Sequence, residues 1–125
     1  MATLQPNQDQ EVTISEKGEL KIYEATAAAG AGPDAVLTVP TGKQWMLKGI
    51  FMVGTGGATQ QRCFIRNTGG TAFLFFADAT TPTLDSTEYT NNDIIMNAGW
   101  NLWFLYSGTT GSASPVRALV QEFDA

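Results

Sequence analysis

The chain contains no histidine and a single cysteine, Cys63, among its 125 residues. Without histidine, the commonest general base and a principal zinc ligand are both missing, and one cysteine cannot close an intrachain disulfide. A serine or cysteine nucleophile activated by histidine is excluded for the same reason. We therefore expect a protein that is not an enzyme, with no catalytic residue, no metal ligand and no cofactor.

Charge is also scarce, since Asp, Glu, Lys and Arg make up 15% of the chain, against about 25% in a typical domain. The net charge is −5, and no run of basic residues offsets it. A phosphate backbone requires a clustered positive field, so we expect no nucleic-acid partner. A surface with so few charges is either solvated by Thr, Asn, Gln and Gly or partly covered by neighbouring subunits.

Long hydrophobic runs are missing as well. No apolar stretch approaches the roughly 20 residues of a membrane span, and the first eleven residues, MATLQPNQDQE, lack the apolar core of a signal peptide. We expect a soluble protein that is made in a cytoplasm and has no membrane partner.

Most of the chain consists of short segments in which apolar and polar residues alternate, separated by Gly, Pro, Asn and Ser. This pattern predicts an all-β antiparallel sandwich of about eight to ten short strands, with no helix. The clearest segment is residues 36–53, VLTVPTGKQWMLKGIFMV, which we interpret as a hairpin that turns at Pro40-Thr41-Gly42.

The second strand of this hairpin presents two faces, because successive side chains point to opposite sides of a sheet. The face that we expect in the core carries Trp45, Leu47, Gly49, Phe51 and Val53. The other face is too apolar to be simply solvated, and we predict that a second copy of the chain covers it. Its apolar members are Met46, Ile50 and Met52.

Three other segments lead to definite expectations. Residues 71–77, TAFLFFA, are the most apolar strand and should be buried on both faces. Residues 78–93 carry four acidic residues and several turn formers, which indicates a long solvated loop with at most a short strand near residues 88–89. Residues 1–24 are predicted to form an N-terminal arm and hairpin that turns at Lys17-Gly18, ahead of a sandwich of residues 25–125.

Two further groups of side chains are candidates for binding. Arg62, Phe64 and Arg66 share one face of a strand, where the arginines either pair with acids of a neighbouring copy or cover their own sheet; we count them as self-association residues. Tyr89 and Trp100 are candidate exposed rings that could stack on a sugar, although aromatic residues more often fill cores. Trp100 is the stronger of the two because it follows a turn.

A resemblance to a known family adds to this interpretation. The run LTVPTGKQWMLKGIFMV, the later segment Gly-Trp-Asn-Leu-Trp and the terminal VRALVQEF resemble small virion proteins of tailed bacteriophages. In that family a "VPxGKxWxLK" segment opens a jelly roll, and an "AGW" turn leads into a late strand. The likeness covers roughly residues 35–123.

The resemblance implies a capsid decoration, or cement, protein: a homotrimer seated on the outer surface of the phage head and bound to the major capsid protein. It also implies that the N-terminal segment and the base of the sandwich make the capsid contact. The residues predicted to dock are Leu4, Val12, Ile14, Leu20, Ile22 and Tyr23. The alternative is a carbohydrate-binding or receptor-binding module of a phage tail tip or fibre that uses Tyr89 and Trp100.

Overall fold

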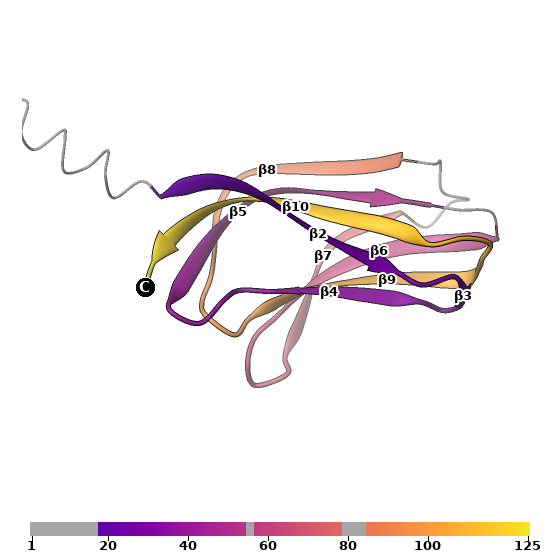
Figure 1. Ribbon diagram of the computed structural model, residues 1–125, viewed down its shortest axis with the longest axis horizontal. Helices are drawn as coiled ribbons and strands as arrows, with labels where there is room; N and C mark the ends of the chain where they lie inside the picture. The colour runs from indigo at the N-terminus through magenta and orange to yellow at the C-terminus, as the bar shows by residue number, and fades with distance from the viewer. Residues whose placement is uncertain (1–17, 55–56, 79–84) are drawn as a thin grey trace, which may run out of the picture.

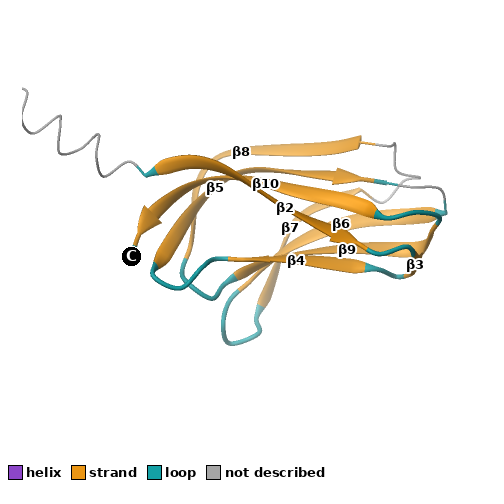
Figure 2. Cartoon of the chain, viewed as in Figure 1, coloured by secondary structure: helices purple, strands orange, loops and turns teal. Residues whose placement is uncertain are grey.

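The computed structural model describes residues 18–54, 57–78 and 85–125, with the backbone alone described at residues 78, 85–87 and 91–93. These residues form nine β-strands and no helix. Figures 1 and 2 show how the strands are arranged. In chain order the strands are β2 (Glu19–Ala27), β3 (Gly30–Ala31), β4 (Asp34–Thr38), β5 (Lys43–Val53), β6 (Ala58–Arg66), β7 (Ala72–Asp78), β8 (Asp85–Met96), β9 (Asn101–Thr110) and β10 (Ser114–Asp124).

The strands form two antiparallel sheets that pack face to face. One sheet has the order β2-β10-β5-β8; in the other, β9 pairs with β6, which pairs with β7, and β3 and β4 both pair with the free side of β9. The chain crosses between the sheets from β2 to β3, β4 to β5, β5 to β6, β7 to β8, β8 to β9 and β9 to β10. This alternation is the jelly-roll topology, so the predicted fold class is confirmed.

The core lies between the two sheets and contains the bulky residues of alternate strand positions. Its largest fully buried side chains include Trp45, Leu47, Met52, Met96, Leu102, Phe104 and Tyr106. Lining both inner faces with large apolar side chains removes most of the available apolar surface from water, which is the main stabilising contribution in a domain of this size.

The segment of residues 36–53 forms the predicted strands and turn. Gly42 has φ +78°, and the amide of Lys43 donates to the carbonyl of Pro40 at 3.1 Å. However, the prediction of a hairpin is wrong, because β4 pairs with β9 whereas β5 pairs with β10 and β8. The turn carries the chain from one sheet to the other, and turn chemistry alone does not distinguish such a crossing from a hairpin.

The predicted faces of β5 are correct only in its first half. Trp45 and Leu47 are buried, but the pairing with β8 shifts register between Leu47 and Gly49. Beyond that shift Ile50 and Met52 point into the core, with exposed fractions of 3% and 0%. The prediction that these two residues lie on a self-association face is therefore wrong, because a bulge exchanges the faces of a strand. Met46 precedes the shift and is half-buried.

Strand β7 contradicts the prediction of burial on both faces. Among the described strands it lies at the edge of its sheet and pairs only with β6, and the side chains of Phe73 and Leu74 are 56% and 58% exposed. Phe75 and Phe76 are partly buried against the core. An apolar segment gains free energy when it is buried, but its composition does not indicate whether its own chain or another molecule buries it.

Two boundaries also differ from the predictions. Residues 85–93 continue into Ile94–Met96 as the single long strand β8, where the sequence predicted an irregular loop. The expected boundary at residue 24 falls inside β2, which pairs with β10 along nine residues and so belongs to the sandwich. The first strand of the predicted N-terminal hairpin, with Val12 and Ile14, lies outside the described residues.

Candidate binding surfaces

A row of residues crosses the outer face of the four-stranded sheet, with one residue from each strand. Ile22 pairs with Leu119, Leu119 with Gly49, and Gly49 with Tyr89. Ile22 and Tyr89 are 67% and 71% exposed. Since Gly49 has no side chain, the middle of the row is hollow.

The hollow is a shallow apolar groove of about 320 Å³, which we call the outer-face groove. Its lining comes from all four strands and consists of Ile22, Gly49, Ile50, Phe51, Tyr89, Arg117, Ala118 and Leu119. A Cβ added at Gly49 would lie 2.8 Å from Cδ1 of Tyr89 and 2.9 Å from the backbone oxygen of Glu88. The glycine is therefore required for β8 and the Tyr89 ring to approach β5 this closely.

One charged side chain forms part of the groove wall. The Arg117 guanidinium lies 5.2 Å from the centroid of the Phe51 ring, and its Nε donates to Oε2 of Glu24 at 2.6 Å. The arginine is thus held over the aromatic ring by both a cation–π contact and an ion pair. The groove offers apolar contact in its floor and the donor groups of Arg117 at one wall.

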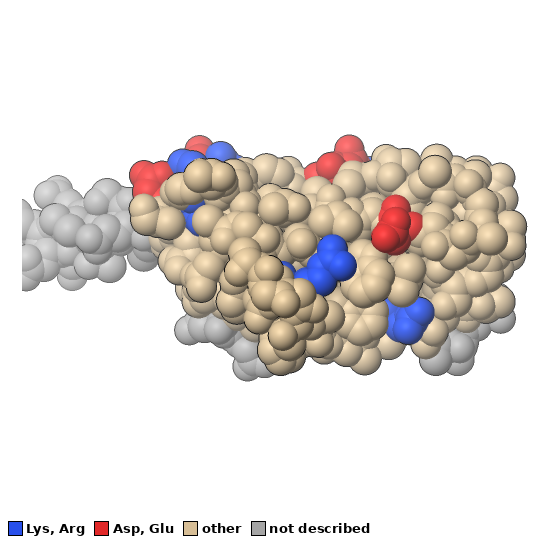
Figure 3. Space-filling view, turned by 90° about the horizontal axis from the view of Figure 1, so that it is seen from below, with Lys and Arg blue, Asp and Glu red and all other residues tan. Residues whose placement is uncertain are grey.

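A second surface lies on the outer face of the other sheet. Val36 pairs with Trp103, Trp103 with Phe64, and Phe64 with Leu74, which gives an apolar row across β4, β9, β6 and β7. Figure 3 views the molecule from this side and shows several charged groups gathered at the left end, with only scattered ones among wide uncharged areas elsewhere. We call it the aromatic row.

The arginines beside the aromatic row contact its rings. Arg66 lies 4.8 Å from the Trp103 centroid and donates from Nε to Asn101 at 3.0 Å, while Arg62 lies 5.7 Å from the Phe64 centroid. The Phe64 and Trp103 rings are 5.4 Å apart. The three predicted self-association residues of β6 thus share one outward face, and both arginines cover their own sheet.

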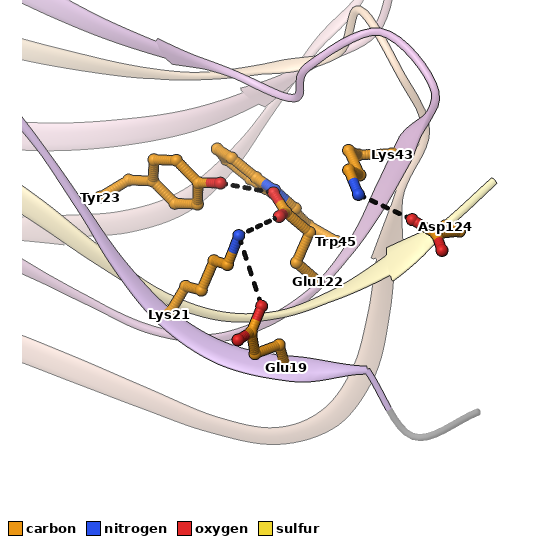
Figure 4. Close-up of polar contacts among 7 residues, drawn as sticks. All are labelled: Glu19, Lys21, Tyr23, Lys43, Trp45, Glu122 and Asp124. Atoms are coloured by element: carbon orange, nitrogen blue, oxygen red, sulfur yellow. Dashed lines mark hydrogen bonds and ion pairs between the residues drawn. The ribbon is translucent and has the colours of Figure 1, made fainter. Parts of the chain in front are cut away.

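A buried carboxylate closes one end of the sandwich (Figure 4). Glu122, with its side chain 4% exposed, accepts hydrogen bonds from Lys21 at 2.7 Å, from the Tyr23 hydroxyl, and from the Trp45 indole at 2.9 Å. Burial by itself would raise the pKa of Glu122, but these three donors outweigh it and lower the pKa to about 2. This cluster joins β2, β5 and β10, so the carboxylate is bound by three donors of its own chain.

The predicted site residues fall in different environments. Leu20 and Ile22 project from the outer side of β2, where Leu20 is 63% exposed. Tyr23 faces the other way: its ring lies 4.8 Å from that of Trp45, and its hydroxyl donates to Glu122. It is therefore wrong as a docking residue in the described fold. Leu4, Val12 and Ile14 lie outside the described residues.

The two candidate exposed rings also differ from each other. Trp100 is half-buried and packs against the core, so its prediction as the stronger exposed ring is wrong; a ring that follows a turn can still fold back onto the sandwich. Tyr89 is exposed beside the groove. Phe51, which was predicted to face the core, lines the groove together with Arg117 and Leu119, which were not predicted as site residues, because only strand pairing brings the three together. The glycine inside an apolar strand was the available signal for a bulge.

Two structural findings bear on other classes of site. In the ranges that the structure describes, no three His, Cys, Asp or Glu residues are grouped so that they could hold a metal ion. No helix of the described chain is long and apolar enough to cross a membrane.

Cys63 is buried, which raises the pKa of its thiol.

No protein-family model matches the chain, and no curated protein sequence matches it significantly. Among solved structures, the family 32 carbohydrate-binding module of C. perfringens NanJ, determined with galactose, is 9% identical with a TM-score of 0.53, over 80% of this chain and 93% of that one. The C. perfringens protein CpGH89CBM32-6 is 7% identical with a TM-score of 0.51, over 85% and 94%. SPBc2 prophage-derived YomS is 12% identical with a TM-score of 0.42, over 82% and 96%. The two C. perfringens structures, with TM-scores above 0.5, share the β-sandwich fold with this chain. At such low identity the similarity does not indicate a ligand.

Proposed function

We propose that this chain is a structural virion protein that decorates the head of a tailed bacteriophage, where the outer face of the four-stranded sheet binds the major capsid protein. One observation carries the proposal: Ile22, 67% exposed, lines the apolar outer-face groove, and Leu20, 63% exposed, lies two residues before it on the same side of β2. Exposed apolar side chains around a concavity gain free energy when a protein partner covers them. The resemblance of residues 35–123 to decoration proteins supports the choice of partner.

The mechanism is a shift in a conformational equilibrium and involves no chemistry. A protein that binds the expanded shell more tightly than its precursor stabilises the expanded state by its differential binding free energy. A sandwich of two packed sheets suits this role, because a rigid surface loses little conformational entropy when it docks. The absence of catalysis and of cofactors is part of the same proposal.

The test is binding of purified protein to expanded, undecorated phage heads, measured by co-sedimentation. We expect Ile22→Lys to weaken binding at least tenfold, equivalent to about 1.4 kcal/mol, because it places a charge at the mouth of the groove. Thr26→Lys is the matched control, since Thr26 is exposed on the same side of β2 but does not line the groove. Equal binding by Ile22→Lys and the control would refute the docking surface.

A carbohydrate-binding or receptor-binding tail module is the second candidate, favoured by the exposed Tyr89 ring at the rim of the same groove. Aromatic faces stack on sugar rings, and the Arg117 guanidinium could donate to a hydroxyl. A glycan array separates the two functions. This candidate predicts a glycan signal that Tyr89→Ala abolishes, whereas the decoration protein gives no signal and binds heads.

A further inference from the structure

The edge strands of this jelly roll are protected very unequally. An edge strand offers unpaired backbone N–H and C=O groups to any other strand, and proteins usually blunt it with charge, shortness or a covering segment. In this sequence β2 carries Glu19, Lys21 and Glu24, β8 carries Asp85, Glu88 and Asp93, and β4 is five residues long and begins with Asp34. Strand β7 has no charged residue from Ala72 to Ala77.

The exposed side chains of β7 lie on both sides of its sheet. Phe73 pairs with the inward-facing Ile65, and Leu74 pairs with Phe64 of the aromatic row. Both are more than half exposed, although their partners on β6 are buried or half-buried. A further strand added alongside β7 would cover both at once, whereas a ligand on one face would cover only one of them.

We propose that β7 pairs with β7 of a second copy of this chain, antiparallel and related by a two-fold axis. In such a contact the residue on the axis meets its own copy, and residues on either side of it meet each other across the axis, so a charge at or next to the axis would lie close to a like charge. The uncharged run from Ala72 to Ala77 avoids that repulsion, and Asp78 at the strand end lies away from the axis when the strand centres are opposed. The charged strands β2 and β8 are less suited to pairing with themselves.

The proposed contact has two structural consequences. The aromatic row of one copy would continue into that of the other, because Leu74 ends the row at the β7 edge. The contact also uses the same edge of both copies, so it closes at two chains. It therefore differs from the trimer that the resemblance to decoration proteins implies, and it does not depend on which partner occupies the outer-face groove.

Analytical ultracentrifugation of the full chain over a wide concentration range tests the proposal. We expect the wild type to sediment as two copies at high concentration, and Leu74→Lys to raise the dissociation constant at least tenfold. Thr71→Lys is the control, because Thr71 is exposed immediately before β7 and should associate as the wild type does. A wild-type mass of one copy at every concentration, a mass of three, or equal association by the two variants would each overturn the proposal.

Hydrogen exchange of the wild type provides a test that does not rely on a folded variant. In the pair, the amides of β7 that point away from β6 acquire partners, so exchange in residues 72–77 should slow as protein concentration rises. Unchanged exchange in this segment across concentrations that change the sedimenting mass would place the contact elsewhere and refute the pairing. Slowing that appears only when phage heads are added would identify the head protein as the occupant instead, and would refute it equally.

Discussion

At the scale of single residues, Glu122 shows how a carboxylate can be stabilising inside an apolar sandwich. It receives three donors from two other strands, and the Trp45 indole that donates to it is itself fully buried. A buried charge is costly unless it is paired and hydrogen-bonded, and this one is both. The cluster fixes the relative positions of β2, β5 and β10 at one end of the molecule.

Replacing Glu122 by Gln should destabilise the fold by about 3 kcal/mol, because this side chain, 4% exposed, loses its charge-assisted hydrogen bonds and the amide presents a donor where an acceptor is needed. Denaturant unfolding at neutral pH measures the change. Asp124→Asn is the matched control. The Asp124 side chain is 89% exposed, so loss of its ion pair with Lys43 should cost less than about 1 kcal/mol. Similar losses in the two variants would contradict the assignment.

The same carboxylate predicts a pH dependence. Its pKa is about 2 in the folded chain against an ordinary 4.5, so the folded state favours the ionised form. The resulting stability is fully present above pH 4.5 and disappears as the pH falls towards 2, a loss of up to about 3 kcal/mol. Unfolding free energies measured across this range should decline more steeply for the wild type than for Glu122→Gln. Parallel curves would show that the group does not titrate as described.

At the scale of an element, the bulge in β5 determines which side chains form the core and which form the groove. Gly49→Ala should cost about 1–3 kcal/mol, because its Cβ would meet the Glu88 carbonyl at 2.9 Å and a backbone atom cannot move aside cheaply. The variant should also displace Tyr89, which a change in tyrosine fluorescence or in its NMR shifts would report. Gly69→Ala, where the nearest atom lies 3.4 Å away, is the control and should be nearly neutral.

Strand β5 also shows which features of the fold could be predicted from the sequence and which could not. Alternation correctly predicted most of the strands, the sandwich and the burial of Trp45 and Leu47, because those depend on local pattern, but it missed residues 85–93 of β8. It assigned Ile50 and Met52 to the wrong face, because the bulge arises from pairing with β8, which a single strand does not encode. The groove was missed for a related reason: its walls come from residues as far apart as Ile22 and Arg117.

At the scale of the whole molecule, the low content of charged residues corresponds to apolar surface on the outside of both sheets. The outer faces of both sheets carry apolar rows that run across four strands, and β7 leaves an uncharged edge beside one of them. Exposed apolar patches commonly mark surfaces that bind other proteins or ligands, and these patches are the basis of the two contacts proposed above.

Hydrogen–deuterium exchange of the chain, free and bound to expanded phage heads, tests this account most directly. Docking through the outer-face groove should slow exchange in the peptides that contain residues 19–24, 49–51 and 117–121, because the capsid protein would cover that side of the sheet. The turn at residues 67–71, which joins β6 to β7 in the opposite sheet, should exchange at the same rate in both states. Bound chains whose groove peptides exchange as fast as those of the free protein would contradict the central claim.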